Sequence, residues 1–312
     1  MFLYITLGVI GFIALTFLAL SLFAYRKTFY QSKKKRITPY GRINMKSFAP
    51  YEERIRELID AMVARECESV SITSRDGIRL SARYYHLSDD APVEIMVHGY
   101  RGHALRDFAG GAKICLDRGH NLLLIDQRAQ GESEGRTISF GIKERFDVID
   151  WVDYVLKRFG KDKKIILVGV SMGAGTVIMA AGESLPENVV GVIADCPFSS
   201  PIDIIERVGR ERGFPRPLIK PLVATGARLF GGFSLFEASP REAAARAKIP
   251  ILIIHGDADR FVPYSMSEEI KAANPSIILE KIEGAEHAVS YLKDTERYVS
   301  LVNAFKDRFL ED

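Results

Sequence analysis

Cysteine is scarce in this sequence, and its three copies form no motif. Cys67, Cys115 and Cys196 are widely spaced and odd in number. This arrangement excludes a disulfide framework and a cysteine-based zinc site, and it fits a reducing compartment. None of the three stands in a context typical of a cysteine nucleophile, so we expect buried structural thiols.

The chain also lacks a strong charge of either sign. Its formal net charge is +3 over 312 residues, and six basic residues fall within the first 36 positions, which contain no acidic residue. The rest of the chain is therefore net −3, a balance that does not indicate a nucleic-acid-binding face. Because 47% of the residues are hydrophobic, the chain contains enough apolar residues to form the core of one large α/β domain.

No charged residue interrupts the apolar stretch from Phe2 to Tyr25. At about 1.5 Å per helical residue, the stretch is long enough to cross a bilayer. A cleaved signal peptide is the less favoured alternative, because no Lys or Arg precedes the stretch, it is too long for an h-region, and no A-x-A-like site follows. We predict a transmembrane helix over residues 1–25. The positive charge that follows it indicates a cytoplasmic location for the rest of the chain.

Residues 26–50 are basic and then polar, with two prolines, and we interpret them as a basic tether that attracts anionic headgroups. A domain over residues 51–312 follows. It opens with a hairpin over 68–86 with an Asp-Gly turn, and then short apolar strands alternate with helices. This alternation predicts a mostly parallel central sheet with helices on both faces. We expect further strands at 93–97, 121–125, 164–168, 189–194, 251–254 and 277–282, and helices at 51–65, 105–117, 143–159, 264–273 and 291–309.

About fifty residues, 197–248, separate two of the expected strands, far more than a usual connection. Prolines and glycines interrupt its helical stretches. Such an insertion at the carboxyl edge of a parallel sheet is a typical place for a lid over an active site. We therefore predict a helical lid. Its basic residues indicate either a solvated helical face or a surface that meets phospholipid or an acidic substrate.

The run from Gly169 to Gly173 has the pattern G-x-S-x-G. An apolar strand precedes it and a helix-compatible stretch of small residues follows, which is the context of a nucleophile elbow. In such an elbow the serine adopts a strained backbone conformation, and only small neighbours fit beside it. The pattern predicts Ser171 as a nucleophile exposed above the carboxyl end of a strand.

A serine nucleophile needs a histidine base and a carboxylate that orients it. In a fold with this elbow the acid follows the serine and the histidine comes last. His287 lies in a loop after the last expected strand, which predicts it as the base. Asp257 and Asp259 both follow the preceding strand and Asp195 ends an earlier one, so all three are candidate acids. We favour Asp259.

The tetrahedral intermediate also needs backbone N–H donors for its oxyanion. We expect one from Met172, the residue after the nucleophile, and one from Tyr100 in the glycine-containing loop after the strand at 93–97. His98 begins that loop. We interpret His98 as a structural residue that hydrogen-bonds the loop rather than as a base.

Four motifs occur in the order typical of one family: residues 98–100, residues 126–133, residues 169–173, and residues 255–263 followed by 284–287. On these motifs the chain resembles the α/β-hydrolase superfamily of serine hydrolases over roughly residues 68–310. The resemblance is greatest to a bacterial branch described as serine aminopeptidase-like or acylglycerol-lipase-like. It implies an α/β-hydrolase fold. It also assigns the acid of H-G-x-x-D-x-x-V-P to Asp259, and it implies that the run D-x-R-x-x-G-x-S is a structural loop.

The resemblance does not fix a substrate, because the branch spans esterases, lipases, thioesterases and peptidases. We expect ester hydrolysis through an acyl-enzyme, with no cofactor and no metal. Membrane attachment favours a lipid-like acyl substrate. Two alternatives stay open at this point: an amidase or aminopeptidase with the same triad, and a binding scaffold without catalysis. The sequence leaves the oligomeric state open.

Overall fold

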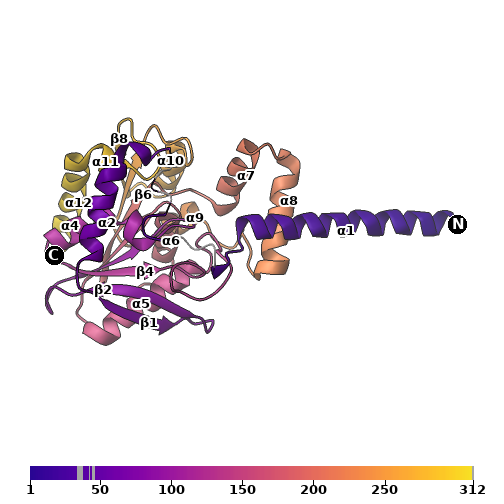
Figure 1. Cartoon of the computed structure of the whole chain (residues 1–312). Coiled ribbons are helices and arrows are strands. Elements are labelled where there is room, and N and C mark those ends of the chain that lie inside the picture. The colour runs from indigo at the N-terminus through magenta and orange to yellow at the C-terminus, as the bar shows by residue number, and fades with distance from the viewer. Residues whose placement is uncertain (34–37, 42, 44–45, 311–312) are drawn as a thin grey trace.

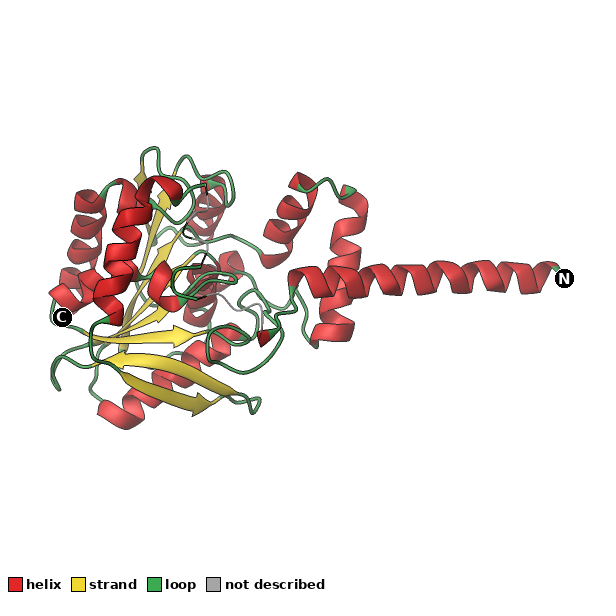
Figure 2. Ribbon diagram, in the orientation of Figure 1, coloured by secondary structure: helices red, strands yellow, loops and turns green. Residues whose placement is uncertain are grey.

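One eight-stranded sheet organises the chain, as seen in a computed structural model that describes residues 1–33, 38–41, 43 and 46–310. The strand order is β1-β2-β4-β3-β5-β6-β7-β8. Figure 1 shows the sheet in the body of the molecule, and Figure 2 shows helices packed around it. The strands are β1 (Glu68–Thr73), β2 (Arg79–Tyr85), β3 (Val93–Val97), β4 (Asn121–Asp126), β5 (Ile165–Val170), β6 (Val189–Asp195), β7 (Ile251–Gly256) and β8 (Ile278–Ile282).

The sheet is parallel from β3 to β8, and only the opening hairpin is antiparallel. Strand β2 pairs antiparallel with both β1 and β4, whereas β4, β3, β5, β6, β7 and β8 pair parallel in turn. Every residue of β3, β4, β5 and β7 is buried, because helices cover both faces of a parallel sheet. The predicted architecture, a mostly parallel sheet after an antiparallel hairpin, is confirmed.

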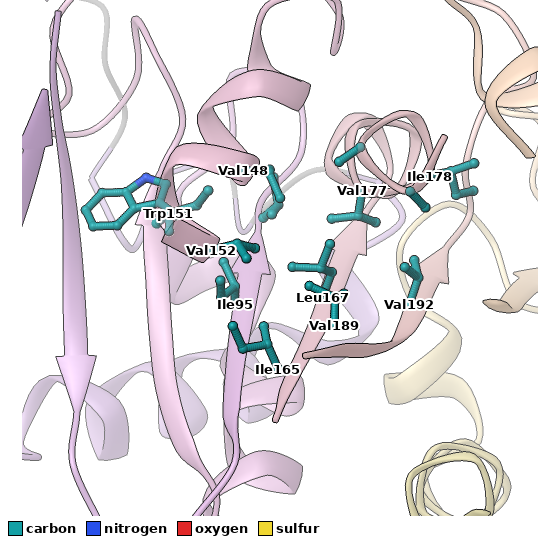
Figure 3. Packing of buried hydrophobic residues seen from close by; sticks show 14 of the residues in the cluster. Ile95, Val148, Trp151, Val152, Ile165, Leu167, Val177, Ile178, Val189 and Val192 are labelled. Carbon is teal, nitrogen blue, oxygen red and sulfur yellow. The ribbon is translucent and has the colours of Figure 1, made fainter. Parts of the chain in front are cut away.

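Alternate residues of the central strands enter two separate cores. Along β3, Ile95 belongs to the core on one face, which contains Trp151, and Met96 belongs to the core on the other face, which contains Phe305. Figure 3 shows the first of these cores, in which helices α5 and α6 lie against β3, β5 and β6. The helices that cover the sheet are α2 (Glu52–Val63), α3 (Ala104–Asp107), α4 (Ala109–Asp117), α5 (Glu144–Phe159), α6 (Met172–Ala181), α9 (Pro240–Arg246), α10 (Tyr264–Ala273), α11 (Ser290–Lys293) and α12 (Thr295–Leu310).

Two predicted helices are each divided. The helix expected at 105–117 is interrupted at Phe108, whose ψ of 15° leaves the helical region while its ring stays buried. The helix expected at 291–309 is interrupted at Asp294, whose Oδ1 accepts a hydrogen bond from the N–H of Arg297 at 3.1 Å. Such a side-chain cap favours a new helix start over continuation. Burial of all three cysteines was also wrong, because Cys67 is exposed next to the edge strand β1.

Helix α1 (Phe2–Thr28) projects from the body in Figure 1. It is long and apolar enough to cross a membrane, with a mean hydropathy of 2.4 in its most apolar window. Its side chains are exposed up to residue 20, and beyond that Ser21 and Tyr25 are buried. There α1 crosses α8 (Arg216–Gly226) so closely that a Cβ at Gly226 would lie 2.6 Å from the carbonyl oxygen of Ser21. Glycine therefore permits this helix crossing.

The segment predicted as a tether begins as part of the folded body. Phe29 is 0% exposed and packs edge-on against Phe140 and Phe233, with ring centroids 5.9 and 5.3 Å away. The N–H of Ile138 donates to the carbonyl of Phe29 at 2.8 Å. Further along, Ile43 is buried against α2. Phe29 and Ile43, within the predicted basic tether of residues 26–50, are thus packed against the body, while Lys34, Lys35 and Arg36 lie outside the described residues.

The predicted lid over 197–248 divides into two parts. Helices α7 (Pro201–Glu211) and α8, with the π-helical turn Ala227–Gly231, stand beside α1 and away from the sheet in Figure 1. Helix α9 instead packs on α6, where Ala243 and Ala244 are fully buried. The part of the insertion that lies beside α1 is therefore the helical hairpin of residues 201–231.

Candidate functional site

Ser171 occupies a strained turn between β5 and α6. Its φ of 55° and ψ of −115° lie outside the regions that L-residues prefer. The turn also requires its glycines: a Cβ at Gly173 would lie 1.7 Å from the carbonyl oxygen of Val97, and a Cβ at Gly169 would lie 2.3 Å from that of Gly173. The sequence pattern thus folds into the sharp turn that was expected of it.

His287 lies in the loop between β8 and α11, opposite Ser171. The Ser171 Oγ is 2.8 Å from His287 Nε2, and His287 Nδ1 is 2.6 Å from Asp259 Oδ2. Because a carboxylate only accepts hydrogen bonds, Nδ1 carries the proton and Nε2 accepts from the serine hydroxyl. Side chains from three separate loops, 116 and 28 residues apart in sequence, thereby form one continuous chain of hydrogen bonds.

Asp259 is buried after β7 and is held as a carboxylate. Its Oδ1 accepts from the N–H groups of Phe261 and Val262 at 2.9 and 2.8 Å. Burial by itself would raise the pKa of Asp259, but hydrogen bonds from His255 and His287 outweigh burial and hold the pKa well below its usual range. Asp259 is therefore ionised across the whole neutral range and can stabilise a positive charge on His287.

The other two candidate acids lie elsewhere. Asp257 is exposed, and its Oδ1 accepts from the N–H of Gly284 at 2.7 Å. Asp195 is buried at the end of β6, 3.4 Å from Ser290 Oγ, and burial raises the pKa of its carboxyl. Among the three, Asp259 is the one that a hydrogen bond joins to His287.

His255 is a supporting residue that sequence reasoning did not assign. It is fully buried at the end of β7, with Nε2 2.9 Å from the carbonyl oxygen of Val262 and 3.3 Å from Asp259 Oδ2. Since both neighbours are acceptors, Nε2 carries the proton, and Nδ1 accepts from Ser267 Oγ at 2.6 Å. His255 thus fixes the position of Asp259. The sequence did contain one indication of this role, namely that His255 lies four residues before Asp259.

The loop after β3 lies beside Ser171 and contacts the end of α1. The Tyr100 hydroxyl donates to the carbonyl of Thr28 at 2.6 Å, and Arg101 Nη2 donates to the carbonyls of Lys27 and Tyr30, each at 3.0 Å. These donors satisfy carbonyl groups at the C-terminal end of α1, where a cation is also favourable. The loop that carries the candidate Tyr100 amide is therefore fastened to α1.

His98 has the structural role that was expected of it. It is fully buried, its Nδ1 lies 2.9 Å from the carbonyl oxygen of Gly99, and its Nε2 accepts from the N–H of Gln127 at 3.1 Å. In the loop after β4, Arg128 pairs with Asp147 and Asp76. These contacts join the loop at 126–133 to the rest of the fold and leave it outside the hydrogen-bond chain of Ser171.

A cavity of about 460 Å³ opens at Ser171. Met172 and Tyr100 line it next to the serine, so the two candidate oxyanion donors belong to residues of the same wall. Most of the remaining lining is apolar and comes from residues 20–28 of α1 and from α7, α8 and the turn between them, and Phe140, Phe198, Phe261 and Val262 complete it. Sequence reasoning missed the contribution of α1, because nothing in a uniform apolar stretch distinguishes residues that face a cavity.

One cluster among the described residues has metal-ligating atoms within 4.8 Å of one another, namely Cys196, Asp259 and His287. It does not fit a metal. Asp259 and His287 bind each other through these atoms, and burial raises the pKa of Cys196 well above its usual value, so its sulfur stays a thiol. The arrangement suits proton transfer from a hydroxyl rather than metal chemistry.

Comparisons with known proteins agree with this fold. A family model described as alpha/beta hydrolase fold matches residues 95–215. The uncharacterized protein YqkD of Bacillus subtilis is 31% identical over 228 residues, which cover 72% of this chain and 74% of YqkD. An esterase of Pyrococcus furiosus has a TM-score of 0.65 at 24% identity, over 80% of this chain and 93% of that one. Est1E of Butyrivibrio proteoclasticus, in a structure with ferulic acid bound, has a TM-score of 0.61 at 22% identity, over 78% of this chain and 100% of that one.

Proposed function

Since the chain belongs to the α/β-hydrolase family, we propose that it is a membrane-anchored serine hydrolase that cleaves carboxylic esters. The observation that supports the proposal most is the unbroken hydrogen-bond chain from Ser171 through His287 to Asp259 at the wall of an apolar cavity. A protein that only binds a ligand does not require a strained serine that is hydrogen-bonded to a histidine and, through that histidine, to a buried carboxylate.

The proposed mechanism follows from these contacts. As Ser171 Oγ attacks the ester carbonyl, its proton passes to His287 Nε2, and Asp259 stabilises the resulting imidazolium. The amides of Met172 and Tyr100 donate to the oxyanion of the tetrahedral intermediate. His287 then protonates the leaving alkoxide, which departs and leaves the acyl group on Ser171. Water, deprotonated by His287, attacks this ester, and the carboxylic acid leaves as Ser171 regains its proton.

The cavity favours a lipid-like acyl group, and one structural neighbour favours an ester as the substrate class. Apolar side chains form most of the cavity lining, which suits an acyl chain rather than a peptide. The solved structure from Pyrococcus furiosus with this fold is named an esterase. An ester is also the easier substrate, since its leaving group needs less assistance from a proton donor than an amine does.

Labelling with a fluorophosphonate tests the proposed nucleophile. We expect stoichiometric labelling of the purified full chain, with the added mass on the peptide that contains Ser171. We further expect turnover of p-nitrophenyl esters and much slower turnover of an aminoacyl p-nitroanilide. Absence of labelling at Ser171 contradicts the proposal, and faster turnover of the anilide indicates a peptidase instead.

We propose that α1 is retained as an anchor rather than removed as a signal peptide, and that the body lies in the cytoplasm. The burial of Tyr25 and Phe29 in the body supports retention. The basic residues after the helix support the orientation. Protease added to intact cells is expected to spare the body and to digest it only after lysis. Digestion without lysis rules out the cytoplasmic location.

A further inference from the structure

We propose that α1 forms one wall of the acyl-binding cavity, and that the acyl chain of a lipid ester enters the cavity sideways from the bilayer in which α1 lies. This inference rests on the proposed hydrolase function of Ser171 and names where its substrate comes from. Under it, α1 determines which acyl chains are accepted, in addition to holding the protein at a membrane.

The lining of the cavity is the first observation. Leu20, Phe23 and Ala24 of α1 face it on one side, and Ile205 and Leu218 of α7 and α8 face it from the opposite hairpin. Leu20 and Phe23 are nevertheless 45% and 48% exposed. Large apolar side chains that border a cavity and are also open on the outside are favourable where the surroundings are hydrocarbon rather than water.

The position of the cavity along α1 is the second observation. Residues 2–19 of the helix lie outside the body with exposed side chains, and at about 1.5 Å per residue they span about 27 Å, close to the hydrocarbon thickness of a bilayer. Helix α8 crosses α1 immediately beyond them (Figure 1). With α1 upright in a membrane, the cavity between α1 and the hairpin therefore lies at the boundary of one leaflet.

The hairpin of residues 201–231 has the composition of a membrane-contacting surface. Phe214 and Leu218 border the cavity at the start of α8 and are 52% and 47% exposed, and Leu229 is exposed on the turn at the other end of α8. Exposed Arg212 and Arg216 flank this apolar tip. Apolar side chains beside exposed arginines suit the level of anionic headgroups. In water these large apolar side chains would be exposed to solvent.

The contact between α1 and the loop after β3 is the third observation. Thr28 of α1 and Tyr100 of the loop both line the cavity, and the Tyr100 hydroxyl donates to the Thr28 carbonyl. One continuous wall thus runs from the bilayer-facing Leu20 to Ser171. A chain that enters beside Leu20 with its ester group leading is directed along α1 toward the serine and the proposed oxyanion donors.

Tryptophan at position 20 tests the role of α1 in acyl selection. In Leu20→Trp, the indole fills the membrane end of the cavity, so the ratio of kcat/KM for p-nitrophenyl dodecanoate to that for the butyrate should fall at least about tenfold. Phe23→Ala removes bulk from the same wall and should shift the preferred chain to greater length. Leu22→Trp is the matched control, because Leu22 is exposed at the same depth and does not line the cavity. If Leu20→Trp and Phe23→Ala both keep the wild-type chain-length profile, α1 is not a wall of the acyl site.

The route of entry is tested with the full chain in phosphatidylcholine vesicles. A fluorogenic two-chain acylglycerol that does not exchange between vesicles is placed either in the same vesicles as the protein or in separate ones. We expect hydrolysis at least about tenfold faster in the shared bilayer, and equal rates exclude entry from the bilayer. Fluorophosphonate labelling of Ser171 in the same samples separates the two hypotheses: labelled protein with equal rates overturns this inference alone, and unlabelled protein overturns the hydrolase function.

Discussion

Replacement of Ser171 by alanine is expected to lower kcat for a p-nitrophenyl ester by about 10⁴- to 10⁶-fold. The variant loses the atom that we propose forms the acyl-enzyme, so His287 has no hydroxyl to activate. Residual turnover would rest on substrate binding and on the proposed oxyanion donors. The loss corresponds to about 5 to 8 kcal/mol of transition-state stabilisation. Steady-state kinetics measures it, and unchanged circular dichroism shows that the fold is retained.

Ser199→Ala is the matched control for this variant. Ser199 is buried near the carboxyl end of β6, and its hydroxyl has no hydrogen-bond partner among the described residues. Removal of an unpartnered buried hydroxyl is nearly neutral, so activity should stay within about twofold of the wild type. If Ser171→Ala retains a tenth or more of the wild-type kcat, a different residue forms the acyl-enzyme.

Replacement of Asp259 by asparagine is expected to lower kcat by about 10⁴-fold. The N–H groups of Phe261 and Val262 donate to Oδ1, so the asparagine oxygen takes that position and its NH₂ group faces His287. Nδ1 must then accept a hydrogen bond, which moves the imidazole proton to Nε2. A protonated Nε2 cannot accept the proton of Ser171. The measurement is kcat at neutral pH, alongside fluorophosphonate labelling rates.

Asp257→Asn provides the control two residues away. Its side chain is exposed and accepts from the N–H of Gly284, and an asparagine oxygen can accept the same bond. We expect activity within about twofold of the wild type. A large loss in Asp257→Asn together with a small loss in Asp259→Asn would assign the acid to Asp257.

The same substitution at Asp259 has a pH-dependent effect on stability. The folded pKa of Asp259 lies well below its ordinary value of about 3.9, so the carboxylate stabilises the fold above that pH. This stabilisation is lost as the pH falls from about 4 toward the folded pKa. An asparagine side chain does not titrate, so the difference in Tm between wild type and Asp259→Asn should shrink between pH 7 and pH 3. A difference that grows on acidification contradicts the assigned direction.

The sequence was sufficient for the parts of this protein that depend on local patterns. The strand at Val93–Val97 and the helix at Tyr264–Ala273 have the predicted limits, because alternation and apolar periodicity are properties of consecutive residues. The elbow at Ser171 was recognisable for the same reason. The contact of His287 with Ser171 was predictable from chain order, since the expected fold places a histidine in the loop after the last strand.

The remaining features depend on contacts between distant residues. Phe29 looked like the start of a tether, and only Phe140 and Phe233, more than a hundred residues away, make it a core residue. His255 supports Asp259 because the chain turns back at Val262. The cavity forms between α1 and the hairpin of residues 201–231. Nothing in the sequence of either segment indicates that it packs near the other.

The docking of Tyr25 and Phe29 has a consequence for encounters at a membrane. A body on a flexible stalk would tumble above the bilayer, and each productive encounter would require it to find one orientation among many. When the inner end of the helix is packed into the body, the body has a fixed orientation relative to the helix. That orientational freedom is lost during folding and not again at each encounter with substrate. In the proposed membrane-anchored arrangement, the molecule would diffuse in two dimensions with the mouth of its cavity turned toward the same leaflet.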